Sequence, residues 1–365
     1  MKTDIDIYTD YLLSSSGQTS ATGLSRLLDG TISHDSVSRF LARSDFTSKS
    51  LWQSVKPLVR SHENGDACLV FDDTIIAKAH TDESDLVCWH YDHAKGCSVK
   101  GINLLTAFYV TERSEDSGCL LVPVSYELIK KPAVMCDLGT RKVIRKGERT
   151  KNEMLRDMLS IAISNQLLFK YVLADSWFSS VENMDFIHRK KKLFIFDVKE
   201  NRLAVRCSDS ADRPNKTGQW TNINELDIPD NTPVQVWLKD LSFPVLLVKQ
   251  VFKNEDGSIL GRRFLVSNDL SLSYHDFATT YKKRWGVEEY HKSLKQNTSL
   301  AKSPAHTIKT QSNHLFCAIW AYVKLEMLKF QTKLNHFQIK AKIYLKALKA
   351  AFEELNSIKQ KALSA

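Results

Sequence analysis

Long apolar runs and paired cysteines are missing from this sequence. No stretch approaches the roughly 18 uninterrupted apolar residues of a membrane span. The first residues, MKTDIDIYTDYLL, carry acids where a signal peptide has basic residues followed by an apolar run. The seven cysteines are scattered without a CxxC pair, which argues for a reducing compartment and against a disulfide scaffold. We therefore expect a cytoplasmic protein.

Glycine and proline are also scarce, with 13 and 8 among 365 residues, and there are no internal repeats or low-complexity segments. The composition, 43% hydrophobic and 25% charged, is that of an ordinary globular protein long enough for two or three domains. Positive charge is in surplus, with 51 Lys and Arg against 42 Asp and Glu, a net +9. That excess suits a polyanionic partner, although surplus lysine is also common on solvated surfaces.

Residues 1–60 are predicted to form a helical region that binds DNA. A short apolar helix breaks at Asp29 and Gly30, and a second helix capped by Ser33 follows. Two short helices across a glycine-containing turn are the outline of a helix-turn-helix. The residues expected to face DNA are His34, Ser36, Ser38 and Arg39. A plain helical hairpin is the alternative.

From residue 67 the pattern changes to short apolar runs bounded by turn residues, as in buried strands. Their order up to residue 198 is strand, strand, strand, helix, strand, helix, strand. This order predicts an α/β fold, a mixed sheet with helices on its faces. Residues 199–270 add polar loops and further strands, a β-rich insertion. Residues 271–330 return to helix, and residues 331–365 form a basic helical tail with seven lysines and two glutamates.

The stretch YKKRWGVEEYHKSLKQ, residues 281–296, has helical character but carries charged and aromatic residues where a core-facing helix is apolar. Because an α-helix advances about 100° per residue, Tyr281, Glu288 and Lys295 fall close to one line. Arg284 lies one turn beyond Tyr281. A stripe of tyrosine, arginine, carboxylate and lysine suits phosphate.

Acids end three separate elements: Asp72 and Asp73 follow the first strand, Asp175 follows the fourth, and Glu288 lies on the polar helix. Ligands and catalytic groups gather at strand ends in sheets of this kind. Three carboxylates without a matching Cys/His set suit Mg²⁺ or Mn²⁺. Two such ions about 4 Å apart would stabilise the attacking and leaving oxygens at a phosphodiester. For any one acid alone, the alternative is a turn former or helix cap.

These motifs resemble those of a known family. The polar helix fits the Tyr-x2-Arg-x3-Glu-x6-Lys signature of DDE transposases of bacterial insertion sequences at all four positions. FDDT and ADSWF are similar to the segments that bear the family's first and second catalytic aspartates. The resemblance covers roughly residues 65–330. It implies a ribonuclease-H-like fold, with residues 61–198 and 271–330 as the catalytic core.

The resemblance also implies roles for individual residues. Asp73, Asp175 and Glu288 would be the catalytic metal ligands. Asp73 is preferred to Asp72 because the family places its aspartate before a hydroxyl residue, here Thr74. The residues that would hold transposon-end DNA are Tyr281, Arg284 and Lys295. The implied cofactor is Mg²⁺ or Mn²⁺, as two ions per active site.

The implied function is a transposase that nicks DNA at the inverted-repeat ends of an insertion sequence and joins the freed 3′-hydroxyl to target DNA. It would act as a homodimer assembled on DNA, associated with the bacterial nucleoid. Two alternatives stay open: a nuclease or resolvase of the same fold that cuts without joining, and a non-catalytic DNA-binding regulator derived from a transposase. The presence of all three acids counts against the regulator.

The segment CWHYDHAKGC contains Cys88, His90, His93 and Cys97. Their spacing does not match the usual zinc-binding forms. We expect a loop near the active site or the DNA rather than a structural zinc site.

Overall fold

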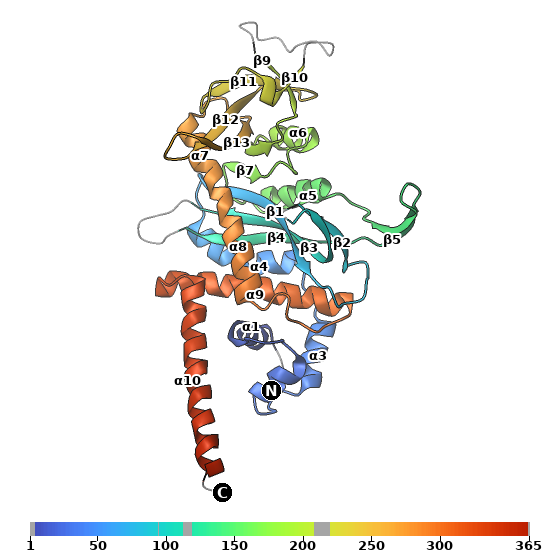
Figure 1. Ribbon diagram of the computed structural model, residues 1–365, viewed down its shortest axis with the longest axis vertical. Coiled ribbons are helices and arrows are strands. Elements are labelled where there is room, and N and C mark those ends of the chain that lie inside the picture. The colour runs from blue at the N-terminus through green and yellow to red at the C-terminus, as the bar shows by residue number, and fades with distance from the viewer. Residues whose placement is uncertain (1–3, 94, 112–118, 208–219, 364–365) are drawn as a thin grey trace.

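The computed structural model describes residues 4–93, 95–111, 119–207 and 220–363 and shows an elongated molecule built around one large sheet (Figure 1). The N-terminal helices and helix α9 lie at one end of the sheet, and the insertion strands lie at the other end. The last helix, α10, projects from the body. Among the described helices, none combines the length and the hydropathy of a membrane span.

The core of the sheet is mixed. Its strands are β1 (Cys68–Ala77), β3 (Cys97–Val110), β4 (Leu121–Ile129), β7 (Tyr171–Ala174) and β8 (Leu193–Val198). β7 pairs parallel with both β1 and β8, whereas β3 pairs antiparallel with β1 and β4. Helix α5 (Lys151–Ser164) precedes β7, and α6 (Val181–Arg189) links β7 to β8. The α/β fold class is therefore confirmed, and the predicted elements occur in the predicted order, with further strands between them.

The β-rich insertion continues the same sheet. Its strands are β9 (Leu203–Arg206), β10 (Thr221–Asn222), β11 (Pro233–Leu238), β12 (Val245–Lys253) and β13 (Ile259–Ser267), with a short 3-10 helix at Ile223–Glu225. β13 pairs antiparallel with β8. The order in the eleven-stranded sheet is β10-β9-β11-β12-β13-β8-β7-β1-β3-β2, with β4 also on β3.

Two features of the sheet were not predicted. β2 (Cys88–Asp92) pairs antiparallel with β3, so the expectation that this segment is a loop was wrong. The strands β5 (Ala133–Asp137) and β6 (Lys142–Lys146) form a separate two-stranded ribbon. Most of the side chains of this ribbon are exposed, so it lacks the apolar alternation that marks a half-buried strand.

The N-terminal region is helical and packs on the rest of the chain. The outer helices are α1 (Ile5–Ser14), α2 (Ala21–Leu27), α3 (His34–Arg43), α4 (Ser48–His62), α9 (Ile308–Thr332) and α10 (His336–Leu363). Asp29 and Gly30 have φ angles of 48° and 75°, which turn the chain between α2 and α3. Ser33 caps α3 by accepting the N–H of Ser36. α1 and α3 pack against α9, and α4 packs against β4.

The helix predicted at residues 281–296 is interrupted. Its segments are α7 (Tyr274–Lys282), a 3-10 turn (Lys283–Trp285) and α8 (Gly286–Asn297). They run on as one rod beside the sheet (Figure 1). Because a 3-10 turn advances about 120° per residue rather than about 100°, three such residues move Tyr281 from about 20° on one side of the line of Glu288 to about 40° on the other side. The predicted stripe is therefore split at the turn.

Gly286 begins α8 where the helix approaches the sheet. A Cβ atom added at this residue would lie 3.0 Å from Cδ2 of Leu121 and 3.9 Å from Cε1 of Phe108. The missing side chain therefore allows α8 to lie close to β3 and β4. Glu288 follows two residues later on the same helix.

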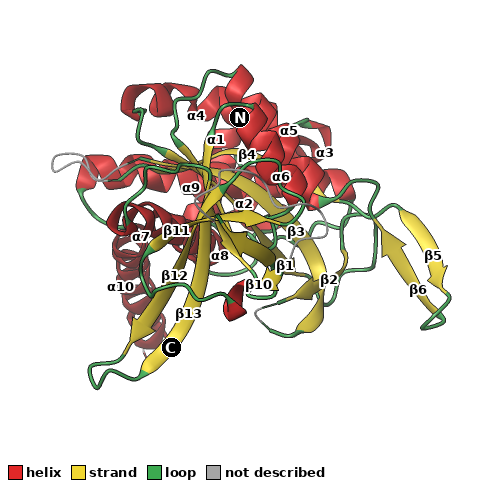
Figure 2. Cartoon of the chain, turned by 90° about the horizontal axis from the view of Figure 1, so that it is seen from above, coloured by secondary structure: helices red, strands yellow, loops and turns green. Residues whose placement is uncertain are grey.

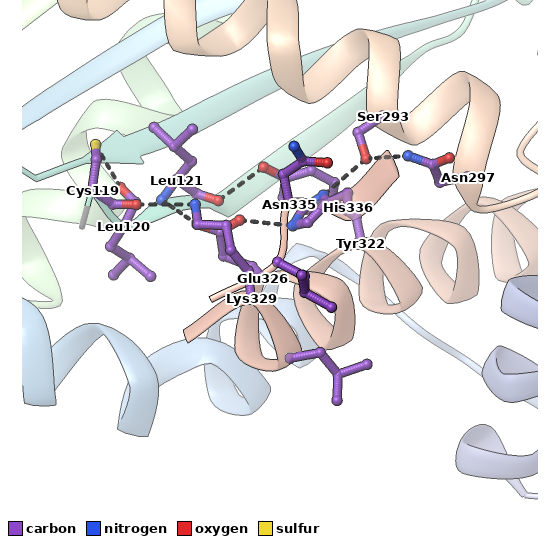
Figure 3. A network of polar contacts seen from close by, with 12 residues as sticks. Cys119, Leu120, Leu121, Ser293, Asn297, Tyr322, Glu326, Lys329, Asn335 and His336 are labelled. Atoms are coloured by element: carbon purple, nitrogen blue, oxygen red, sulfur yellow. Dashed lines mark hydrogen bonds and ion pairs between the residues drawn. The ribbon is translucent and has the colours of Figure 1, made fainter. Parts of the chain in front are cut away.

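A buried polar network joins α8 to α9 and α10 (Figure 3). Nδ1 of His336 lies 2.9 Å from Oγ of Ser293 on α8, and Nε2 of His336 lies 2.9 Å from Oε2 of Glu326 on α9. Oε1 of Glu326 accepts the backbone N–H of Leu121 on β4 at 3.1 Å. The Glu326 side chain is only 1% exposed. The network therefore ties α8, which carries Glu288, to two helices and to the sheet.

We predict that Glu326→Ala lowers the free energy of unfolding by about 3–5 kcal/mol, because it leaves buried partners without their carboxylate. Glu353→Ala, on the exposed part of α10, is the control and should change the free energy by less than about 0.5 kcal/mol. Urea unfolding followed by circular dichroism measures both. Equal effects of the two variants would contradict this role for the network.

Candidate active site

A cavity of about 450 Å³ opens where β7 ends, beside the middle of β1 and α8. β1 continues through Asp72 and Asp73 to Ala77, so the expectation that these two aspartates end the first strand was wrong. Its polar lining combines acids with bases and aromatic rings. The lining acids are Asp72, Asp73, Asp92, Asp175 and Glu288. The basic and ring-bearing residues are Tyr91, His93, Lys95, Lys151, Trp177, Arg284, His291 and Lys295. The three acids predicted to be catalytic are thus brought together.

The parallel pairing of β1 and β7 brings the aspartates together. Phe71 pairs with Ala174 at the end of this ladder, so the next residues, Asp72 and Asp175, lie next to each other where β7 ends. The prediction that the first and fourth strands are neighbours is confirmed. Oδ1 of Asp175 accepts the backbone N–H of Trp177 at 3.0 Å, which holds the carboxylate at the turn after β7.

Asp72 and Asp73 contact different cations within the cavity. Neighbouring strand residues point to opposite faces. Nζ of Lys151, the first residue of α5, donates to both carboxylate oxygens of Asp73 at 2.8 and 2.7 Å. Nη1 of Arg284 lies 3.6 Å from Oδ2 of Asp72. Asp73 was the sequence-based choice, but both aspartates line the cavity.

Arg284 connects the helix to the strand. Its Nη1 lies 3.7 Å from Oε1 of Glu288, one helical turn on, as well as near Asp72. Lys295 also lines the cavity, and burial followed by the charge of Lys95 lowers its pKa. Arg284, Glu288 and Lys295 therefore meet as the stripe predicted.

Tyr281 does not line this cavity with them. It is 3% exposed, and its hydroxyl donates to the carbonyl oxygen of Ala174 at 3.3 Å. This contact lies at the last residue of β7, next to Asp175. Arg39 is exposed on α3 and is not among the lining residues. The DNA contacts of Tyr281 and Arg39 stay predictions.

The acids of the cavity repel one another. Burial, followed by the charge of Asp175, raises the pKa of Asp72 to about 7, although Arg284 opposes the shift. Burial also raises the pKa of Asp175, which the N–H of Trp177 partly offsets. The pKa of His291 is lowered to about 3 by burial and by Lys295, so this ring is neutral near pH 7. Burial and neighbouring acids thus outweigh the nearby cations in setting the pKa of both aspartates.

The donor set fits a hard divalent cation, because carboxylates without thiolates face one cavity. Within the described residues, however, no three His, Cys, Asp or Glu side chains stand close enough to hold an ion as they are placed. Lys151 occupies both oxygens of Asp73, and Arg284 lies between Asp72 and Glu288. An ion bound here would replace part of the charge neutralisation that Lys151 and Arg284 now provide to the carboxylates.

The residues that sequence reasoning missed are Lys151 and an aromatic wall. Nζ of Lys151 lies 5.1 Å from the centre of the Trp177 ring. The ring centre of His93 lies 5.2 Å from that of Trp177 and 4.8 Å from that of Tyr91. These segments are far apart in the sequence, so no local pattern marks them. For Tyr91, the nearest signal was the CWHYDHAKGC segment, which we expected near the active site.

The same segment does not form a zinc site among the described residues. Sγ of Cys88 lies 3.3 Å from Nε2 of His90, and both side chains are buried on the inner face of β2. Cys97 is exposed and His93 turns to the cavity. The four residues therefore divide between the core, the solvent and the acidic cavity.

The raised pKa of Asp72 predicts that stability falls as the pH rises. An unfolded aspartate ionises near pH 4, whereas folded Asp72 retains its proton up to about pH 7. Between these values the folded state binds more protons, so stability decreases with pH. Asp72→Asn, in EDTA, should raise Tm by roughly 2–4 °C at about pH 8 and hardly at all at about pH 4.

Calorimetry at both pH values tests this, with Asp82→Asn at an exposed position as the control. A Tm shift that is the same at both pH values would mean that ionisation of Asp72 is not the cause.

A family comparison extends over most of this architecture. The profile of the DDE superfamily endonucleases matches residues 1–235, well over half of the chain. The matched part includes β1, β7 and their aspartates and ends before α8. No curated protein matches the sequence. The chain belongs to the DDE superfamily endonuclease family.

Proposed function

We propose that this endonuclease-family protein is a transposase, which cleaves DNA at the ends of an insertion sequence and joins them to target DNA. The observation that carries the proposal is the meeting of Asp73, Asp175 and Glu288, from two strands and a helix, in one cavity. Asp72 is a fourth carboxylate there. The match to a DDE endonuclease family supports DNA as the substrate.

The carboxylates would hold Mg²⁺ or Mn²⁺, two ions per site, and these ions would stabilise charge on the phosphate and lower the pKa of the attacking water or hydroxyl. The chain's own cations have a separate task. Arg284, Lys295 and Lys95 line the same cavity, where they bind and orient the phosphates on either side of the scissile bond. The aromatic ring of Trp177 limits the space beside them.

In this proposal Tyr281 positions other residues of the site. Its hydroxyl holds the carbonyl of Ala174, and the guanidinium of Arg284 lies 5.8 Å from its ring centre. The residue thereby fixes the end of β7 relative to the helical rod. In this way it supports both Asp175 and Arg284.

The N-terminal helices would read the terminal inverted repeats. His34, Ser38 and Arg39 are exposed on one side of α3, and Val37 and Leu41 are buried on the other. An exposed polar face on the second helix of such a pair is the arrangement that enters a major groove. Two copies of the chain would assemble on the two ends, associated with the bacterial nucleoid.

Two adjacent glutamates provide a matched test of the catalytic assignment. Glu288→Gln should lower Mg²⁺-dependent cleavage and strand transfer at least about a hundredfold, because a metal ligand is lost or misplaced. Glu289→Gln should retain most of both activities, since Glu289 is exposed and does not line the cavity. Gel assays with a labelled end duplex and a plasmid target measure both steps.

An inactive Glu289→Gln protein beside an active Glu288→Gln protein would refute the assignment. Cleavage by the wild-type chain without any joining would favour the nuclease alternative. Absence of both activities, with retained end binding, would favour the regulator.

The end-reading role of α3 has its own test. Arg39→Ala should weaken binding to the inverted repeat by roughly tenfold, the effect of one lost base contact, and leave binding to random duplex nearly unchanged. Lys56→Ala removes the same charge from the exposed face of α4 and should alter neither affinity. Fluorescence anisotropy measures the dissociation constants of the wild-type protein and both variants on the two duplexes. An equal loss on both duplexes would show that Arg39 contacts only phosphate.

A further inference from the structure

The ribbon of β5 and β6, with its flanking residues 130–149, forms an arm that stands away from the large sheet (Figures 1 and 2). Its apolar side chains lie in solvent: Leu138 at the tip is 91% exposed and Val143 is 75% exposed. A ribbon that exposes apolar side chains and two unpaired edges is a docking element. The residues around the acidic cavity do not require it for their packing.

Positive charge dominates the arm. Residues 130–149 contain seven Lys and Arg against one Asp and one Glu. Asp137 is occupied locally, because its Oδ1 accepts the N–H groups of Gly139 and Thr140 at the tip. Lys142 and Lys146 are exposed, and neither forms an ion pair within the described residues. Asp137 pairs with Lys142 across the ribbon, and the arm as a whole has a net charge of 7 − 2 = +5.

The arm has two distinct faces. Directly paired residues of an antiparallel ribbon share a face, and neighbours along a strand alternate. The register pairs Val134 with Arg145 and Met135 with Ile144. Lys142 and Lys146 consequently lie on the Met135 face, to either side of Ile144, and Arg145 lies on the opposite face. Lysines around apolar side chains thus form one surface.

The opposite face anchors the arm to the body. Arg145 Nε lies 3.0 Å from Glu83, and its Nη1 lies 3.0 Å from Asp85. The backbone N–H of Lys131 donates to the carbonyl of Asp85, and Nζ of Lys131 donates to the carbonyl of Trp89 on β2. These contacts fix the direction of the root and leave the lysine face free.

The arm is connected directly to the acidic cavity. β6 ends at Lys146, and α5 begins at Lys151, whose ammonium holds Asp73. β2 also runs from the root of the arm to the cavity, since Trp89 contacts Lys131 and Tyr91 lines the cavity. A duplex that enters the cavity would therefore lie close to the root of the arm.

We propose that the arm enters a groove of the duplex next to the cleavage site, with Lys142 and Lys146 on phosphates and Leu138 against the bases. This inference rests on the proposed function in taking DNA as the substrate. A two-stranded ribbon fits a major groove about 12 Å wide, and apolar side chains at the end of such elements contact or separate base pairs. Duplex DNA offers the polyanion that the lysine face lacks.

The salt dependence of binding tests the arm. Two lost phosphate contacts reduce the slope of log affinity against log salt by about 1.8, so Lys142→Ala/Lys146→Ala should show this decrease on a random-sequence duplex. Lys49→Ala/Lys56→Ala removes the same charge from the exposed face of α4 and should retain the wild-type slope. Leu138→Ala should weaken binding without changing the slope, because an apolar contact releases no counterions.

A wild-type slope for Lys142→Ala/Lys146→Ala, or an equal decrease in the control pair, would overturn the proposal. If the arm variants instead change the oligomeric state in sedimentation without DNA and keep the slope, the arm binds a second copy of the chain. If the full-length wild-type protein does not cleave DNA but the salt slopes are as expected, the proposed transposase function is refuted and the arm is still a DNA contact.

Discussion

The parallel pairing of β1 with β7 is the constraint on which the site depends. The register of Phe71 with Ala174 brings Asp72 and Asp175 together where β7 ends. Buried carboxylates this close repel, and the raised pKa of both aspartates reflects burial and this repulsion. Arg284 offsets part of it from the helix side. Carboxylates clustered in this way favour divalent cations.

The helical rod of α7, the 3-10 turn and α8 supplies the rest of the site. Contacts at several positions along the rod hold it in place. Tyr281 bonds the end of β7, Gly286 permits close approach to the sheet, and Ser293 joins the network of His336 and Glu326. These contacts involve strand, sheet face and two further helices. These contacts lie on both sides of residue 288 along the rod.

Local patterns predicted much of this and missed what depends on packing. The buried strands are local features, so the order of the predicted ones was predictable, and β1 and β7 were expected as neighbours in a mixed sheet. That β1 continues through Asp72 and Asp73 to Ala77 was not predicted. The 3-10 turn before Gly286 lies in a run that otherwise favours α-helix. The departure of Tyr281 from the line of Glu288 and Lys295 could therefore not be predicted from the sequence. Lys151 reaches Asp73 only through tertiary packing. The exposed ribbon at residues 133–146 has no half-buried alternation.

The central claim is that β1, β7 and α8 together hold divalent ions. Fe²⁺ bound in place of Mg²⁺ generates hydroxyl radicals with ascorbate and peroxide, and these cut the polypeptide near the ion. The account predicts fragments that end near residues 72–73, 175 and 288, and their loss when Mg²⁺ is added in excess. Cuts confined to residues 88–97, or cuts that Mg²⁺ does not suppress, would contradict it.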